Sequence, residues 1–136
     1  MELQDYFKNY RIRRATFLDE EQFSSILLMF PAMLVGLADG KLDVSEKHNL
    51  AASIKEVIDD DLLLGFEMYS ELIYLMFADT QTQNEALECL KELVVSDAEM
   101  KLAVAEIMTA MAEASGGMTA GEEKKIKELR TYLSIV

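Results

Sequence analysis

Apolar residues recur along the chain at the three- and four-residue spacing of α-helices, and no stretch alternates like a half-buried strand. Residue pairs that fit a capping box precede the helical runs: a Ser, Thr or Asp caps the first turn, and a Glu or Gln three residues later reaches back. Five such pairs occur: Asp19/Gln22, Asp43/Glu46, Thr82/Glu85, Ser96/Glu99 and Thr119/Glu122. The pattern predicts an all-α, single-domain helical bundle of about six to seven helices. Pro31 lies inside the first long helix and predicts a kink or a split there.

The segment from Leu62 to Phe77 is apolar on most of its helical surface. Only Glu67, Ser70, Glu71 and Tyr74 form a polar stripe along it. A helix that is hydrophobic nearly all round is typical of the middle of a domain. We therefore expect this helix to be central, and we expect its charges to belong to a solvated stripe rather than to an acid/base pair.

A repeat links two distant parts of the chain. Residues 38–46 (ADGKLDVSE) match residues 114–122 (ASGGMTAGE), and each copy stands between a helix rich in small residues and an amphipathic helix. The pattern predicts two helix hairpins, in which Gly40 or Gly116 ends the first helix in a left-handed cap. Leu42 or Met118 then turns inward, and Asp43 or Thr119 caps the second helix together with Glu46 or Glu122. Two such hairpins predict an internal pseudo-twofold repeat whose first helices pack closely.

The repeat divides the chain. We predict a single domain over 1–136, made of a basic N-terminal arm or short helix (1–18), a first repeat (19–59), linking helices (60–96) and a second repeat (97–136).

Charge is distributed unevenly. The chain has 136 residues and a net charge of −12, yet Lys8, Arg11, Arg13 and Arg14 make the N-terminal arm basic. An acidic chain is a poor binder of nucleic acid, so we expect no nucleic-acid partner. The longest apolar run, residues 26–38, is shorter than the roughly 20 residues that a membrane span needs. We expect a cytoplasmic protein with no membrane insertion.

The duplicated motif, Ala-Asp-Gly-x-Leu-Asp-x-x-Glu in its first copy, resembles that of the TerB-like family, which includes tellurite-resistance TerB and an N-terminal domain of some DnaJ-type proteins. The resemblance covers residues 19–59 and 97–133. It implies an all-helical fold with two pseudo-symmetric hairpins and a cytoplasmic, stress-associated module without established catalysis. The family's acidic positions fall on Asp39, Asp43 and Glu46 in the first copy. In the second copy Ser115 and Thr119 replace the two aspartates, and only Glu122 keeps its acid.

The acidic motif raises the question of a metal site. Carboxylates of Asp39, Asp43 and Glu46 could bind a divalent cation such as Ca²⁺ or Mg²⁺. A true EF-hand is disfavoured because Val35 and Leu37 occupy the positions of its first two ligands. Asp43 and Glu46 also fit a capping box, and Thr119 with Glu122 makes the same box without the extra aspartate. We favour the structural interpretation and keep the cation as the alternative.

Residues suited to catalysis are scarce. His48 is the only histidine and Cys89 the only cysteine, and no phosphate-binding loop or nucleophile elbow is present. We find no catalytic constellation. The sequence predicts a non-enzymatic acidic helical module with a protein-interaction or stress-response role, and a divalent-metal-binding regulator is the alternative. A protein partner is expected, and a homo-oligomer is compatible with the sequence.

Overall fold

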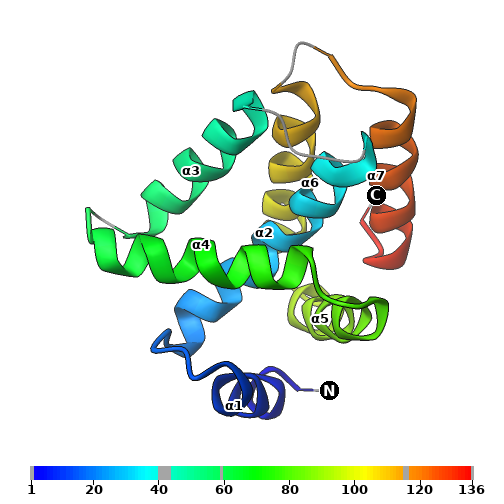
Figure 1. Ribbon diagram of the computed structural model, residues 1–136. Helices are drawn as coiled ribbons and strands as arrows, with labels where there is room; N and C mark the ends of the chain where they lie inside the picture. The colour runs from blue at the N-terminus through cyan, green and yellow to red at the C-terminus, as the bar shows by residue number, and fades with distance from the viewer. Residues whose placement is uncertain (1, 40–43, 59, 115–116, 136) are drawn as a thin grey trace.

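The computed structural model describes residues 2–39, 44–58, 60–114 and 117–135. Within them the chain forms seven α-helices and one short 3₁₀ turn, with no strand (Figure 1). The elements are α1 (Leu3–Arg14), α2 (Glu20–Gly36), η1 (Leu37–Asp39), α3 (Val44–Ile58), α4 (Leu62–Met76), α5 (Thr80–Val94), α6 (Ala98–Glu113) and α7 (Ala120–Tyr132). The prediction of an all-α bundle is confirmed.

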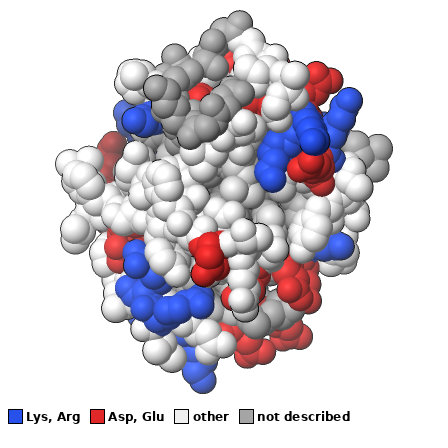
Figure 2. Space-filling view, turned by 45° about the vertical axis from the view of Figure 1, so that its right-hand side comes forward, with Lys and Arg blue, Asp and Glu red and all other residues white. Residues whose placement is uncertain are grey.

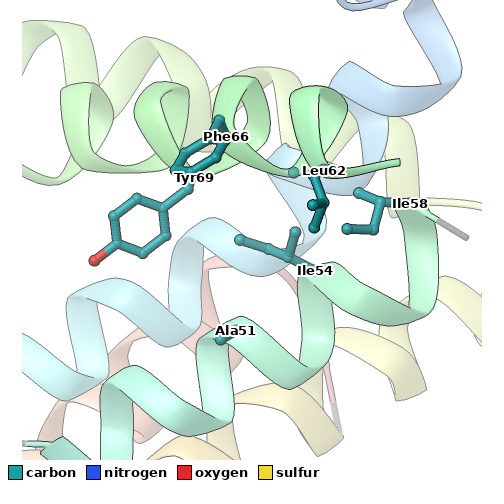
Figure 3. A pocket seen from close by; sticks show the side chains of 7 residues that line it. Ala51, Ile54, Ile58, Leu62, Phe66 and Tyr69 are labelled. Atoms are coloured by element: carbon teal, nitrogen blue, oxygen red, sulfur yellow. The ribbon is translucent and has the colours of Figure 1, made fainter. Parts of the chain in front are cut away.

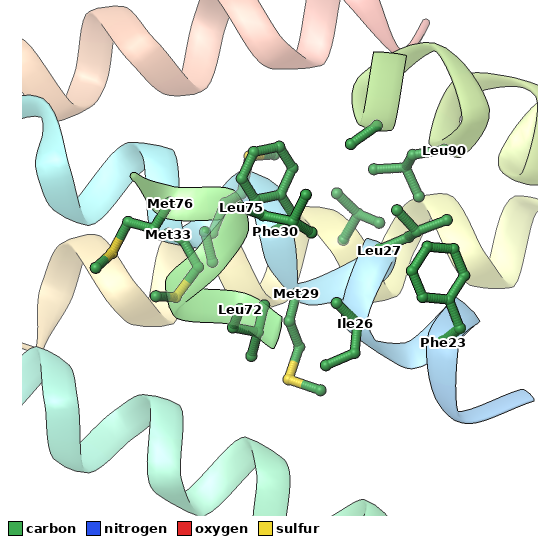
Figure 4. Close-up of a cluster of buried hydrophobic side chains, with 14 of the residues drawn as sticks. Phe23, Ile26, Leu27, Met29, Phe30, Met33, Leu72, Leu75, Met76 and Leu90 are labelled. Carbon is green, nitrogen blue, oxygen red and sulfur yellow. The ribbon is translucent and has the colours of Figure 1, made fainter. Parts of the chain in front are cut away.

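The central helix is α2, which contacts each of the other six helices (Figure 1). Its side chains Phe23, Ile26, Leu27, Phe30 and Met33 are fully buried and form the middle of the core (Figure 4). The helix runs unbroken through Pro31, so the alternative that Pro31 splits it is wrong. Proline has no N–H to donate to the preceding turn, and the helices packed around α2 stabilise it in spite of that missing hydrogen bond.

The placement of α4 corrects a second prediction. The helix lies at the surface, across α2 and beside α3, rather than in the middle of the domain (Figure 1). Its core-facing side inserts Leu72, Leu75 and Met76 against α2 (Figure 4). The opposite side of α4 faces solvent.

The two halves of the chain contact each other reciprocally. The first helices of the two hairpins, α2 and α6, share the most extensive helix–helix contact in the described residues. The second helix of each hairpin packs against both first helices, since α3 contacts α2 and α6, and α7 contacts α6 and α2. Four pairs of equivalent positions are buried in both copies: Val35 and Met111, Gly36 and Ala112, Glu46 and Glu122, Leu50 and Ile126. This pattern matches the predicted internal repeat of hairpins.

Two of the five predicted capping boxes are present. Asp19 with Gln22 caps α2, and Thr119 with Glu122 caps α7. The boxes predicted at Thr82/Glu85 and Ser96/Glu99 are wrong. The α5 helix begins earlier, where Asp79 accepts a hydrogen bond from the Thr82 amide (2.7 Å). Ahead of α6, Asp97 accepts from the Met100 amide (3.0 Å).

Three helices are thus capped by an aspartate without a capping box: Asp61 caps α4, Asp79 caps α5 and Asp97 caps α6. An aspartate caps an N-terminus as well as Ser or Thr does, and its charge also suits the positive end of the helix dipole. The fifth box involves Asp43, which lies outside the described residues.

Candidate protein-docking surface on α4

Several of the motif residues named from the sequence lie within the described residues, and there Thr119 and Glu122 cap a helix. In the second copy, the Thr119 amide donates to Glu122 Oε1 (3.0 Å) and the Glu122 amide donates to Thr119 Oγ1 (3.1 Å). Glu122 is fully buried in this arrangement. The prediction that Met118 turns inward is wrong, since the structure leaves its side chain 40% exposed. Gly117 takes a positive φ of 153°, which a glycine adopts without strain.

The first copy is described only in part. Glu46 is buried in the first turn of α3, at the position equivalent to Glu122. Asp39 ends η1, but its side chain lies outside the described residues, as do Gly40, Leu42, Asp43 and, in the second copy, Gly116. Within the described residues, no three His, Cys, Asp or Glu side chains lie together in a way that could hold a metal ion.

The charges of α4 point into the protein. Glu71 is 2% exposed, and its carboxylate accepts hydrogen bonds from the Tyr10 hydroxyl at Oε1 (2.7 Å) and from Arg14 at both oxygens (2.9 and 3.1 Å). The Arg14 guanidinium also lies over the ring of Tyr74, 4.0 Å from its centroid. A bidentate arginine and a buried hydroxyl together satisfy most of the hydrogen-bonding capacity of a carboxylate.

Glu67 is engaged in the same way one turn earlier. Its Oε2 accepts from the Thr16 hydroxyl (3.0 Å) and from the Phe17 amide (3.1 Å). Both glutamates therefore fasten α1 and the connection to α2 onto α4. The basic N-terminal arm therefore packs against the core as part of the fold. It contributes Tyr6, Phe7 and Tyr10 to a cluster of aromatic rings around Phe23.

Titration behaviour supports a structural role for these groups. Burial raises the pKa of the Tyr10 hydroxyl, and its hydrogen bond to Glu71 raises it further. The hydrogen bonds that Arg14 itself donates to Glu71 raise the pKa of Arg14. Burial also raises the pKa of the Cys89 thiol to about 11, so the thiolate that a nucleophile requires is disfavoured at neutral pH. His48 is exposed, and so is Glu106 on α6.

With its carboxylates bound to α1 and the connection to α2, α4 presents an apolar side to solvent. We call this side the α4 outer face, and its most exposed members are Leu62 (74%), Leu63 (70%), Phe66 (73%) and, just after the helix, Phe77 (74%). Tyr69 and Ile73 continue the stripe between them at helical spacing. Contiguous exposed apolar surface on a small domain is typical of a binding site.

A groove runs beside this face, between α3 and α4 (Figure 3). It has a volume of about 340 Å³ and is lined by Ala51, Ile54 and Ile58 of α3 and by Leu62, Gly65, Phe66 and Tyr69 of α4. At its floor a Cβ on Gly65 would stand 2.9 Å from Ile58 Cδ1, so the close approach of the two helices favours glycine at this position. The lining contains no charged residue.

The charged side chains of the surface are scattered in small groups. On the face shown in Figure 2, Lys and Arg gather in separate patches with acidic side chains near them, and uncharged surface lies between. Among the described residues drawn there, Lys and Arg form no continuous basic stripe of the kind that tracks a nucleic-acid backbone.

The α4 outer face was missed from the sequence. Glu67, Ser70, Glu71 and Tyr74 were interpreted as the solvent side of the helix, whereas the structure buries Glu71 and turns the other side outward. The available signal was the pair of basic residues at the end of the N-terminal arm, Arg13 and Arg14, which could supply partners for buried carboxylates.

Comparison of the chain with protein-family models, with curated proteins and with solved structures found no match. None of the helices in the described residues is long and apolar enough to cross a membrane.

Proposed function

We propose that the chain is a TerB-like, non-enzymatic module that acts by binding another protein through the α4 outer face and the adjoining groove. The observation that carries the proposal is the large apolar surface that α4 leaves in solvent. Buried Glu71 and half-buried Glu67 are bound to α1 and its connection to α2, while Leu62, Leu63 and Phe66 are each at least 70% exposed. Exposing these side chains contributes nothing to folding, because apolar surface left in water lacks the stabilisation that burial provides.

The groove supports the same proposal. Two diverging helices with apolar residues at successive turns form the type of surface on which a further helix packs. Aromatic side chains, which dominate the binding energy of protein interfaces, are present at Phe66, Tyr69 and Phe77. The chemistry of the candidate carboxylates favours no enzymatic alternative, since Glu67 and Glu71 are occupied by α1 and its connection to α2.

Site-specific photocrosslinking tests the proposal in the cells that make the protein. A photoreactive phenylalanine at position 66 should yield a discrete adduct. The matched control is position 102, because Leu102 is 59% exposed on α6, where its neighbours in a shallow pocket include Arg130 of α7. The proposal fails if position 66 gives no adduct, or only the adducts that position 102 also gives.

A further inference from the structure

We propose that the α4 outer face binds a second copy of this chain, so that the protein forms a twofold-symmetric dimer. This inference rests on the proposed function and names its partner. Three observations on this face carry it: its area, its shape and the arrangement of charge on its rim.

The area matches a dimer interface. The exposed parts of Leu62, Leu63, Phe66, Tyr69 and Phe77 amount to roughly 600 Å² of apolar surface, taking about 200 Å² for a fully exposed side chain of this size. Pairing two copies would bury roughly twice that area, which reaches the lower end of the range for stable protein–protein interfaces, about 1,200–2,000 Å². A short peptide in the groove would leave Leu63 and Phe77 uncovered.

The shape is self-complementary. A twofold interface uses the same surface on both subunits, so that surface must offer a projection and a matching hollow. Here Phe66, whose side chain is 73% exposed, stands beside an open apolar groove of about 340 Å³ that it lines together with Ile54 of α3 (Figure 3). An aromatic ring of one copy can therefore enter the groove of the other, and the reverse contact follows from the symmetry.

Charge permits pairing on this face in particular. Two chains that each carry a net charge of −12 repel each other over most orientations. The α4 outer face has no charged member, and the carboxylates of α4 are bound on its inner side. Its rim carries both signs, with exposed Asp60 and Asp61 at the α3–α4 junction and exposed Lys47 towards the other end of α3.

The rim charges also favour one orientation. α3 and α4 diverge from their junction (Figure 1), and Lys47 is in the first turn of α3, at the end of that helix away from the junction. A half-turn that places the junction of one copy over the open end of the other brings Asp60 towards Lys47 of the second copy. Opposite charges at a rim orient association and suppress other arrangements.

Sedimentation equilibrium of the full chain at physiological salt tests the dimer. The wild type should show twice the single-chain mass of 15.4 kDa. Phe66→Glu should raise the dissociation constant of the dimer at least about 100-fold, because each dimer carries the buried charge twice. Leu102→Glu, which adds the same charge at an exposed leucine of α6, should leave the dissociation constant within about threefold of the wild type.

Leu62→Glu serves as a second interface variant, so that the result does not depend on the folding of one protein, and circular dichroism reports the helix content of each. A wild type that stays monomeric up to about 1 mM, or interface variants that dimerise as the wild type does, would overturn the proposal. If the wild type is monomeric while position 66 crosslinks to a different protein, the dimer is wrong and the proposed function stands. If position 66 gives no adduct either, both are wrong.

Discussion

The two sides of α4 are both largely apolar, and they differ in that the charged side chains of the helix are bound on the inner side alone. On the inner side, Glu71 is buried and bound by Arg14 and Tyr10. On the outer side, Leu62 and Phe66 stand in solvent. A surface helix normally turns its charges outward and its apolar residues inward. The inner side serves the fold, by holding α1, whereas our proposal assigns the outer side to a contact with another molecule.

The strongest test of the inner side is Glu71→Ala. The substitution leaves Arg14 and the Tyr10 hydroxyl without their carboxylate, and breaking a buried ion pair typically costs 3–5 kcal/mol. Because the Arg14 side chain is 31% exposed and partly screened by water, we expect the low end, a loss of about 3 kcal/mol in the free energy of unfolding. Urea denaturation measures it, with Glu106→Ala as the control, because Glu106 is an exposed carboxylate on α6. A loss below about 1 kcal/mol would show that the buried pair does not hold α1.

Tyr10→Phe removes one hydrogen bond of the same cluster and keeps the ring. A hydrogen bond to a charged group contributes about 1.5–3 kcal/mol, but Arg14 still binds the same oxygen, so we expect a loss of about 1–2 kcal/mol. Tyr69→Phe makes the identical change on the outer face and should shift the free energy of unfolding by less than about 0.5 kcal/mol. Equal effects at the two positions would contradict the difference between the two sides.

A helix-capping carboxylate provides a reference for the stability losses expected at Glu71 and Tyr10. Asp97→Ala should cost about 1 kcal/mol in urea denaturation, because Asp97 accepts the Met100 amide at the start of α6. Ser96→Ala should cost less than about 0.5 kcal/mol, since the cap is one residue further along. The reverse order would restore the capping box expected at Ser96.

The smallest effect is expected for Gly65→Ala. Alanine is favoured over glycine inside a helix by about 1 kcal/mol, while the new methyl group must displace the flexible end of Ile58, which lies 2.9 Å away. These contributions oppose each other, so the free energy of unfolding should change by less than about 1 kcal/mol. The groove becomes shallower, so crosslinking from position 66 should fall. Unchanged crosslinking would show that the groove is not part of the docking surface.

Much of the helical organisation could be predicted because its signals are local. The boxes at Asp19/Gln22 and Thr119/Glu122 lie within single turns, and the repeat places α2 and α6 in equivalent roles. Where two candidate caps stand close together, as Ser96 and Asp97 do, the pattern of residues alone did not distinguish them. Met118 was expected inside because its motif position is apolar, but the turn leaves it partly in solvent.

The orientation of α4 could not be predicted for a different reason. A helix that is apolar on nearly every side carries little information about which side meets the core, so its two charges were taken as the solvent side. The group that pairs with Glu71 is Arg14, 57 residues earlier in the chain. Such a pairing depends on how α1 folds back, which the local pattern does not determine.

The most direct test of the account compares unfolding of the wild type with that of Leu62→Ser/Phe66→Ser over a wide range of protein concentrations. A partner that binds only the folded state raises apparent stability with concentration. We predict that the two proteins unfold at nearly the same urea concentration when dilute, and that only the wild type becomes more stable as its concentration rises. A variant that is much less stable than the wild type at every concentration would contradict the account, because the α4 outer face would then belong to the fold rather than to an interface.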